Sequence, residues 1–287
     1  MKDYFGYKGK TCVVTGAASG MGKAATEILV DLGAKVYTLD MNEVKVPGIS
    51  AYIYCYLSDK KSIDDAFAKI PDKIDKFFGF AGVSGEKHDA KTTIACNYLA
   101  NWYIMNEYLS KRVHGDEGAV MICTSIGANR WYAPLNNDEL FPLVEAADWD
   151  EAMKILDVIS VDLTAGQAYT FSKRCAGYAT MKFAVECAPK HVRVNSIKPG
   201  PAITGLTKDF MSRDKLELEE WSKKYGGAVG RAGEAREMAE PAVFLNSDMA
   251  SYISGAELII DYATDSKVYL GGNDMWLATK LQHKYVK

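Results

Sequence analysis

The stretch Thr11-Cys12-Val13-Val14-Thr15-Gly16-Ala17-Ala18-Ser19-Gly20-Met21-Gly22 decides the fold class of this chain. A short apolar run leads directly into three glycines, and a helix-like segment begins at Lys23. Glycine suits such a strand-to-helix turn because the backbone must turn tightly and bring its N–H groups close to a bound pyrophosphate. We therefore expect the turn to hold a dinucleotide through Gly16, Ser19, Gly20, Met21 and Gly22. A glycine-rich turn that binds nothing is the simpler alternative.

The rhythm of a short apolar run followed by a helix-length amphipathic segment continues along the chain. The runs expected to be strands are Thr11–Thr15, Lys35–Leu39, Tyr52–Cys55, Lys76–Phe80, Ala119–Thr124, Val192–Ile197 and Glu257–Ile260. The segments expected to be helices are Gly22–Leu32, Ser62–Ala68, Thr92–Lys111, Ala168–Glu186 and Ala235–Asn246. This alternation predicts an α/β fold of the Rossmann type, a doubly wound parallel sheet with helices on both faces. No repeat or linker divides the sequence, so residues 1–287 are predicted to form a single domain.

Composition and charge exclude several classes of protein. Of the 287 residues, 48% are hydrophobic and 25% are charged, and the formal net charge is −3. These values are typical of a globular protein and argue against disorder and against a basic surface for nucleic acid. No apolar run is long enough to cross a membrane and the first residues show no secretory signal, so we expect a cytoplasmic protein. The six cysteines lack Cys-x-x-Cys spacing, which predicts buried reduced thiols and no metal site.

The residue that closes the second expected strand bears on the choice of cofactor. Asp40 follows Gly16 by 24 positions, where a carboxylate can accept hydrogen bonds from a ribose diol and would repel a 2′-phosphate. This favours NAD(H) over NADP(H), whereas the simpler interpretation is an exposed or helix-capping aspartate. A P-loop is disfavoured because five residues separate Gly16 from Gly22 and Ala24 follows Lys23.

A tyrosine and a lysine are spaced for acid–base chemistry on a predicted helix. Tyr169 and Lys173 are four positions apart, so both side chains lie on one face. A phenol ordinarily titrates near about 10, so a nearby cation such as Lys173 is needed for proton exchange near neutral pH. Ser125 follows the fifth expected strand at the edge where parallel sheets place ligands, and it can orient a carbonyl and stabilise oxyanion charge. Thr124 is a competing hydroxyl, and such a serine can also be only a turn residue.

Taken together, these residues resemble the short-chain dehydrogenase/reductase family, from about residue 9 to residue 261. The segments that carry the resemblance are Thr15–Gly22, Asp40, Ala81-Gly82, Asn97, Ser125, Tyr169 with Lys173, Arg193–Gly200, Gly230–Glu234, Phe244–Ser247 and Gly255–Asp261. The resemblance implies that Ser125, Tyr169, Lys173 and Asn97 are catalytic. Tyr169 would exchange a proton with the substrate oxygen, and Asn97 would hold a water in the proton relay.

The resemblance also implies a set of residues that contact the nicotinamide cofactor. Ile203 would contact the carboxamide through its backbone and Thr204 would contact the cofactor through its hydroxyl. The remaining residues implied to contact the cofactor are Leu57, Ala81, Gly82, Tyr169, Lys173, Pro199 and Gly200. Members of the family are usually homodimers or homotetramers, which is the expectation here.

The sequence departs from the family pattern at several places. Gly79-Phe80 replaces a pair of asparagines before Ala81, so some hydrogen bonds of that turn must be made differently, and Tyr56 replaces an acid, which leaves an adenine contact from Asp59 open. Ser125 and Tyr169 are 44 positions apart, where about a dozen is usual, so residues 129–161 are an expected insertion. This insertion and the segment 203–230, an expected substrate lid, are predicted to cover the site. Residues 262–287 form a C-terminal extension.

The insertion and Gly79–Gly82 resemble the bacterial 3α-hydroxysteroid dehydrogenase/carbonyl reductase branch of the family, in which the insertion modifies subunit contacts and the substrate entrance. A hydroxysteroid or bile acid is therefore the favoured substrate. Large apolar side chains in the expected coverings either line a pocket for such a substrate or only fill the core beneath a lid or a dimer contact. They are Trp131, Tyr132, Phe141, Trp149, Leu206, Phe210, Met211 and Trp221, of which Trp131, Leu206 and Phe210 are the expected substrate contacts.

Three other functions are left open by the sequence. A general carbonyl or sugar-alcohol reductase would use the same chemistry, and a non-catalytic NAD-binding regulator would use only the cofactor site. A serine hydrolase is less favoured, because Ser125 lacks a Gly-x-Ser-x-Gly setting, although Ser84-Gly-Glu-Lys87 matches Ser-x-x-Lys.

Overall fold

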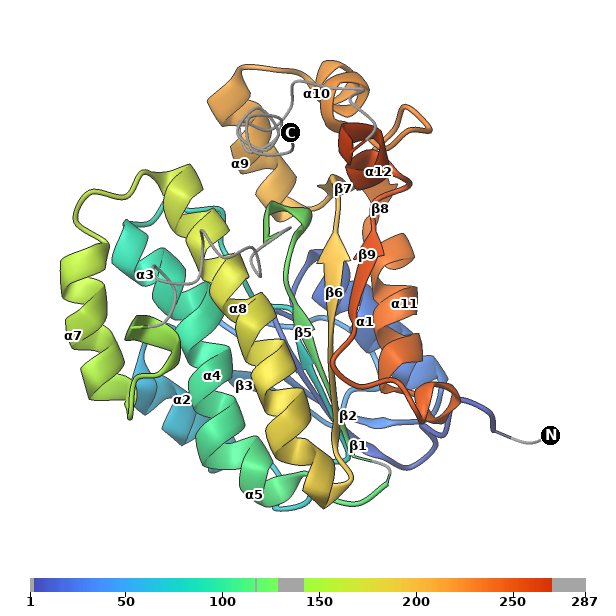
Figure 1. Cartoon of the computed structure of the whole chain (residues 1–287). Coiled ribbons are helices and arrows are strands. Elements are labelled where there is room, and N and C mark those ends of the chain that lie inside the picture. The colour runs from blue at the N-terminus through green and yellow to red at the C-terminus, as the bar shows by residue number, and fades with distance from the viewer. Residues whose placement is uncertain (1–2, 117, 129–141, 270–287) are drawn as a thin grey trace, which may run out of the picture.

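A parallel sheet of seven strands runs through the centre of the molecule (Figure 1). The computed structural model describes residues 3–116, 118–128 and 142–269. The strands are β1 (Thr11–Thr15), β2 (Lys35–Asp40), β3 (Ala51–Tyr54), β4 (Lys76–Gly79), β5 (Ala119–Cys123), β6 (Arg193–Pro199) and β9 (Glu257–Ile260). Their spatial order is β3-β2-β1-β4-β5-β6-β9. The chain adds β2 and β3 on one side of β1 and then β4 and the later strands on the other side, which confirms the predicted doubly wound α/β fold.

The central strands are covered on both faces, and apolar side chains fill β5, whereas β6 also buries Arg193, Asn195, Ser196 and Lys198. Every residue of β4, β5 and β6 is buried, as expected for parallel strands covered by helices on both sides. The register aligns the carboxyl ends of neighbouring strands, with Thr15 of β1 opposite both Leu39 of β2 and Gly79 of β4. The loops that follow these strands therefore meet at one edge of the sheet, which we call the carboxyl edge.

Helices cover both faces of the sheet. In Figure 1, α1 (Gly20–Asp31) and α11 (Ala235–Asn246) lie side by side on one face. The other face carries α2 (Lys60–Phe67), α8 (Ala165–Cys187) and a longer helical run from residue 90 to 112. That run consists of α3 (Ala90–Ile94), η1 (Ala95–Leu99), α4 (Ala100–Ile104), η2 (Met105–Leu109) and α5 (Ser110–Arg112), of which η1 and η2 are π-helical turns. The remaining short helical turns are η3 (Ile126–Ala128), η5 (Ala188–Lys190) and η6 (Asp248–Ala250).

The segment 203–230 stands over the carboxyl edge. It contains α9 (Gly205–Asp214) and α10 (Leu218–Tyr225), which lie above the ends of the strands in Figure 1. A two-stranded parallel ribbon of β7 (Ala202–Ile203) and β8 (Gly233–Glu234) closes the base of this segment. The short helix α12 (Thr264–Tyr269) follows β9 on the same side.

The described part of the insertion does not cover the site, contrary to expectation. Its helix α7 (Trp149–Ile159) lies outside α3, remote from α9 and α10 (Figure 1). Trp149 is buried and meets the Tyr103 ring edge-on at 5.4 Å, and Lys91 of α3 pairs with Asp157. The apolar face of α7 is covered by the helical layer, which is why Trp149 is a core residue. The other expected aromatic residues of the insertion, Trp131, Tyr132 and Phe141, lie outside the described residues.

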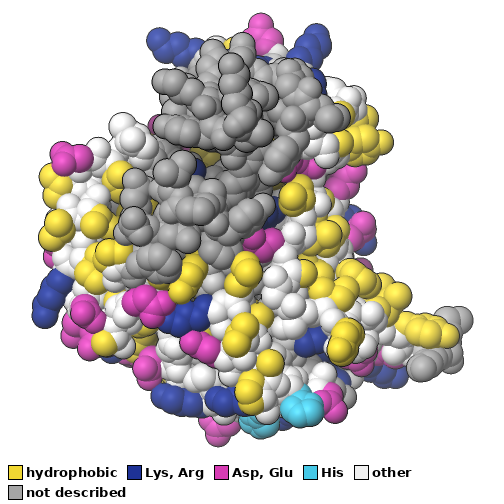
Figure 2. Space-filling view, in the orientation of Figure 1, with side chains coloured by type: hydrophobic (Ala, Val, Ile, Leu, Met, Phe, Trp, Pro, Cys, Tyr) yellow, Lys and Arg dark blue, Asp and Glu magenta, His cyan; other side chains and the backbone are white. Residues whose placement is uncertain are grey.

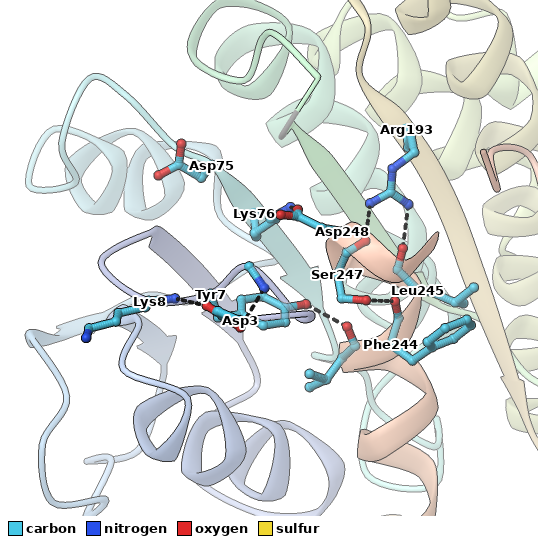
Figure 3. A network of polar contacts seen from close by, with 12 residues as sticks. Asp3, Tyr7, Lys8, Asp75, Lys76, Arg193, Phe244, Leu245, Ser247 and Asp248 are labelled. Atoms are coloured by element: carbon cyan, nitrogen blue, oxygen red, sulfur yellow. Dashed lines mark hydrogen bonds and ion pairs between the residues drawn. The ribbon is translucent and has the colours of Figure 1, made fainter. Parts of the chain in front are cut away.

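The amino edge of the sheet, opposite the carboxyl edge, is held by a buried polar network (Figure 3). Arg193 points from the start of β6 to the end of α11 and donates to the carbonyl oxygens of Leu245 at 2.6 Å and Ser247 at 2.9 Å. Lys76, fully buried at the start of β4, pairs with Asp248 at 3.3 Å. The Tyr7 hydroxyl donates to the carbonyl oxygen of residue 243 at 2.6 Å. These contacts fasten the N-terminal segment and α11 to the sheet.

The visible surface mixes charges of both signs. Basic and acidic side chains are interspersed around the face shown in Figure 2, in keeping with the net charge of −3. Within the described ranges, no helix is both long and apolar enough to span a membrane.

Candidate active site at the carboxyl edge of the sheet

A cavity of about 600 Å³ lies at the carboxyl edge, where the loops after β1, β2, β3, β4, β5 and β6 meet. It extends from Met41 and Asn42 after β2 to Trp221 and Tyr225 of α10. The walls are mostly apolar, with a few polar groups that converge between the two ends. This is the usual position and character of a ligand site in an open α/β sheet.

The glycine turn forms one wall, and its shape requires glycine. Gly16 has φ +71°, and a Cβ atom there would lie 2.7 Å from the backbone of Ala81. A Cβ atom on Gly22 would lie 2.2 Å from the carbonyl oxygen of Gly16. Ser19, Gly20 and Met21 complete this wall at the N-terminus of α1. The turn therefore presents bare backbone and a helix N-terminus to the cavity, an arrangement that binds phosphate groups.

Asp40 lies at the same end of the cavity and is fixed by backbone donors. Its Oδ2 accepts from the Ala18 N–H at 3.0 Å, and its Oδ1 accepts from the Asn42 N–H at 2.9 Å. An ionised carboxylate has further lone pairs, so Asp40 can still accept from hydroxyl groups in the cavity. Asp59, by contrast, caps α2 by accepting from the Ser62 N–H and does not line the cavity.

The helix α8 carries Tyr169 and Lys173 into the middle of the cavity. It begins at a capping box in which Thr164 and Gln167 satisfy each other's backbone N–H groups, so its first turn is firmly defined. Lys173 is buried, its Nζ lies 5.8 Å from the centre of the Tyr169 ring, and it donates to the Cys123 carbonyl oxygen at 2.8 Å. An ammonium group has three donors, so others remain for a ligand.

Ser125 faces Tyr169 from the end of β5. Its Oγ accepts from the Gly127 N–H at 3.1 Å, which leaves its own proton for a group in the cavity. A Cβ atom on Gly127 would lie 3.5 Å from Ser125 Oγ and 3.8 Å from Tyr169 Cε1, so the two side chains approach one common space. The competing hydroxyl of Thr124 is buried and donates to the Ile197 carbonyl oxygen at 2.8 Å. Both residues line the cavity, but the Thr124 hydroxyl proton is used between two strands, so Ser125 is the one whose hydroxyl proton remains for a ligand.

Asn97 lies behind the cavity wall, in the π-helical turn η1. Its Oδ1 accepts from the Val83 N–H at 2.7 Å, and its Nδ2 donates to the Val83 carbonyl oxygen at 3.0 Å and to Ser172 Oγ at 3.1 Å. This amide holds the Ala81–Val83 turn, which directly follows the Gly79-Phe80 pair that replaces the usual asparagines. The water-holding role that the resemblance implies for Asn97 stays a prediction.

Most of the other expected cofactor residues line the cavity. They are Leu57, Ala81, Gly82, Pro199, Gly200 and Thr204. Ile203 does not contribute to the lining, although its neighbours Ala202 and Thr204 do. A Cβ atom on Gly82 would lie 3.1 Å from Asn97 Oδ1 and 3.5 Å from Lys173 Nζ, so this glycine keeps the space between the two side chains open.

The far end of the cavity is mostly apolar, with Arg213 as a charged exception, and is closed by the segment 203–230. Leu206, Phe210 and Trp221 line it, whereas Met211 does not. The Phe210 ring meets the Tyr169 ring edge-on, with 5.7 Å between centres. The expected contact Trp131 lies outside the described residues. Sequence reasoning missed several lining residues: Val83, His88, Ile126, Gly127, Gly166, Thr170, Arg213 and Tyr225.

These missed residues have a partial signal in the sequence. Val83 follows Ala81-Gly82, Ile126 and Gly127 follow Ser125, and Thr170 follows Tyr169. Proximity to an expected site residue could have found them. Nothing local indicates that Arg213 and Tyr225 reach the same cavity, because they come from two different helices of the covering segment.

Cysteine chemistry is disfavoured in the cavity. Cys55 and Cys96 both line it, and burial raises the pKa of Cys55 to about 12 and that of Cys96 to about 11. These thiols therefore remain protonated near neutral pH and are weak nucleophiles. The polar groups that face the cavity centre are instead a hydroxyl, a phenol and an ammonium group, which can bind and protonate a carbonyl oxygen.

Comparisons with known proteins agree with this chemistry. A family model described as enoyl-(acyl carrier protein) reductase matches residues 156–262. The NAD-dependent glycerol dehydrogenase of Listeria innocua is 31% identical, with 90% of this chain and 94% of that protein covered. The 3-alpha-hydroxysteroid dehydrogenase/carbonyl reductase of Comamonas testosteroni is 26% identical, with 88% and 96% covered. A crystal structure of the 3-alpha-hydroxysteroid dehydrogenase from Pseudomonas sp. B-0831 complexed with NADH superposes with a TM-score of 0.74 at 26% identity and covers 91% of this chain and 99% of that one.

Proposed function

The chain belongs to the short-chain dehydrogenase/reductase family of oxidoreductases, and from this premise we propose that it interconverts a secondary alcohol and a ketone with NAD(H), most favourably on an apolar hydroxysteroid or bile acid. The observation that carries the proposal is the convergence of Ser125 and Tyr169 on one space beside Lys173, at the end of a glycine-lined groove. Residues 203–230 would serve as the substrate lid.

The described residues fit a nicotinamide dinucleotide. The turn Gly16–Gly22 has the bare backbone that a pyrophosphate requires, and Asp40 stands where the adenosine ribose would lie. A carboxylate at that point binds a ribose diol and repels a 2′-phosphate, which supports NAD(H) over NADP(H). When bound, the nicotinamide supplies or accepts the hydride.

The chain's own residues would bind the substrate oxygen and move its proton. The Ser125 hydroxyl donates to that oxygen, because a ketone oxygen can only accept and the Ser125 proton is not used by the Gly127 N–H. The Tyr169 hydroxyl gives a proton to the oxygen during reduction and takes it back during oxidation. Lys173, held by the Cys123 carbonyl oxygen, places its positive charge beside the phenol and stabilises the anionic form that arises when the proton leaves.

The apolar end of the cavity supports a bulky substrate. Leu206, Phe210 and Trp221 surround the space beyond Tyr169, and a fused-ring alcohol would bury its apolar surface there. Binding energy from this remote part of a substrate can also raise turnover at the reacting carbon.

The decisive experiment follows the absorbance of reduced nicotinamide while the purified protein receives NAD or NADP with hydroxysteroids that differ in the position of the hydroxyl. Turnover with NAD on one position is the expected result and would identify the carbon that reacts. The variant Asp40→Ser should shift the cofactor preference toward NADP, and a preference unchanged by this substitution would contradict the proposed role of Asp40.

A small alcohol or polyol is the second candidate substrate. It is favoured by the relatives named NAD-dependent glycerol dehydrogenase and cyclohexanol dehydrogenase. Small alcohols in the same assay separate the two candidates: turnover that gains nothing from a steroid nucleus would favour the small substrate. Should neither class react while NAD binds, Tyr169→Phe tests a regulator that only binds the cofactor, because such a regulator would keep its activity in this variant.

A further inference from the structure

Two side chains of the loop after β4 converge on one carboxylate of the covering segment. Ser84 Oγ donates to Asp209 Oδ2 at 2.9 Å, and Lys87 Nζ lies 2.5 Å from Asp209 Oδ1. Ser84 is buried, and the Asp209 side chain is only 14% exposed. The Ser-x-x-Lys match therefore joins the loop to α9, and both of its functional groups are used in doing so.

The same loop is fixed to the catalytic helix. Gly85 is buried with φ +86°, and a Cβ atom there would lie 2.9 Å from the Ala165 carbonyl oxygen in the first turn of α8. The Glu86 N–H donates to Ser84 Oγ at 3.3 Å, which holds the Ser84 hydroxyl between the loop and Asp209. The loop thus lies against the first turn of α8 at a point where no side chain would fit.

The residue that follows Asp209 in α9 contacts the catalytic tyrosine. Phe210 meets the Tyr169 ring edge-on at 5.7 Å, and the Arg213 guanidinium covers Phe210 at 5.3 Å. Arg213 also lies 3.6 Å from Glu86 of the same loop. The contacts form a closed circuit from α8 to the loop, from the loop to α9, and from α9 back to Tyr169.

We propose that Asp209 is a positioning residue of the substrate site: gripped by Ser84 and Lys87, it sets where Phe210 stands against Tyr169 and thereby how wide the apolar end of the cavity is. The proposal rests on the proposed function. It assigns Asp209 to substrate binding and not to the proton or hydride steps, because its carboxylate faces the loop and does not line the cavity.

Kinetics of four single substitutions and one double variant test this role. Asp209→Ala should raise KM for a bulky alcohol about tenfold, the scale of a lost charge-assisted hydrogen bond, while kcat and KM for NAD stay within about twofold. Asp209→Asn keeps an acceptor for Ser84, so its KM should lie between those of wild type and Asp209→Ala. Asp209→Glu keeps the negative charge, so its KM should also be lower than that of Asp209→Ala. Ser84→Ala should raise KM as well, and combining it with Asp209→Ala should add little.

The matched control removes an acid of the same segment that does not reach the loop. Within the described residues, Glu219 of α10 forms its ion pair inside its own helix, with Lys223 at 2.7 Å. Glu219→Gln should leave KM unchanged. An Asp209→Ala enzyme with the KM of wild type, or a loss confined to kcat, would overturn the proposal.

A second measurement does not depend on turnover. Trypsin can cut at Arg213 of α9 and at Lys215, the residue that follows α9, close to the contact of Asp209 with Ser84 and Lys87, which we call the clamp. Cleavage after Lys208 is not used, because Asp209 is the next residue and its substitution changes that site directly. Asp209→Ala should be cut there severalfold faster than both wild type and Glu219→Gln, while the thermal unfolding midpoint changes little. If wild type shows no alcohol turnover but cleavage still accelerates, the proposed function fails and the clamp stands. If cleavage does not change, the clamp fails whatever the activity.

Discussion

Two buried lysines at opposite edges of the sheet have similar surroundings, but only one of them borders a cavity. Lys173 at the carboxyl edge lies 5.8 Å from the centre of the Tyr169 ring, and Lys76 at the amino edge lies 5.9 Å from that of Tyr7 (Figure 3). Both are almost completely withdrawn from solvent. Lys173 borders the cavity and donates to one carbonyl oxygen, whereas Lys76 does not line it and pairs with Asp248.

The comparison shows that a buried cation beside a phenol does not by itself make a reactive site. At the amino edge, the Tyr7 hydroxyl donates to a carbonyl oxygen of α11, and the Arg193 guanidinium donates to the carbonyl oxygens of Leu245 and Ser247. These groups fasten helices and strands together. At the carboxyl edge, the hydroxyl and ammonium protons border a space that a ligand can enter. Access to a cavity distinguishes groups that a ligand can reach from groups that only hold the fold together.

The largest expected difference between the two edges is in activity. Lys173→Met should lower kcat/KM about 10³-fold, the scale of assisted proton transfer, because it removes the cation beside Tyr169. Lys76→Met should leave kcat/KM unchanged, since Lys76 is remote from the cavity. Steady-state kinetics of both variants with one alcohol check this, and a similar loss in both would remove the distinction.

The polar contacts at the amino edge should contribute to the free energy of unfolding. Arg193→Met should lower the free energy of unfolding by about 3 kcal/mol, because it removes a buried charged donor from the carbonyl oxygens of Leu245 and Ser247, of which, within the described residues, only that of Ser247 keeps another donor, the Ala250 N–H. Chemical denaturation measures the change. The matched control is Arg236→Met, which breaks an exposed pair with Glu240 and should change stability by less than about 0.5 kcal/mol. Equal effects would show that burial of Arg193 contributes nothing.

A smaller loss is expected from the partner of Lys76. Asp248→Asn should lower the free energy of unfolding by about 1 kcal/mol, because Lys76 keeps an acceptor but loses the opposite charge. The effect is limited because the Asp248 side chain is 45% exposed. Asp65→Asn, which breaks an exposed pair with Lys61, serves as the control in the same denaturation assay. An Asp248→Asn protein as stable as wild type would mean that the pair makes no net contribution.

The smallest predicted effect is a pH dependence at the amino edge. Burial lowers the pKa of Lys76 below its ordinary value of 10.5, so the folded state binds this proton less tightly than the unfolded state does. The stability contributed by Lys76 should therefore rise as pH approaches 10.5 and fall as pH drops through the lowered pKa. Relative to Lys76→Met, wild type should gain stability as the pH rises over this range. Denaturation of both proteins at several pH values isolates the lysine, and a difference that stays constant would contradict its lowered pKa.

The sequence predicted elements well where the pattern is local. The glycine turn, the seven strands and the Tyr169-x-x-x-Lys173 spacing depend on neighbours within one strand or one helical turn, so residue order suffices. The insertion shows the limit. Trp149 is a large apolar residue in a long interruption, and the sequence cannot tell whether such a side chain faces a cavity or the Tyr103 ring of a distant helix. Arg213 and Tyr225 were missed for the same reason.

By itself, the sequence determined the fold class and predicted where a cofactor groove and an acid–base pair would lie, because periodicity, glycine geometry and helical spacing act over a few residues. Only the tertiary structure decided which hydroxyl keeps its proton for a ligand, which buried lysine supports the fold and what Ser84 and Lys87 hold. Thr124 and Ser125 are adjacent and both line the cavity, yet the Thr124 hydroxyl donates to a neighbouring strand and the Ser125 hydroxyl does not. Ser84 and Asp209 are 125 positions apart and still share a hydrogen bond. Such pairings arise when separate elements pack, so no local pattern can announce them.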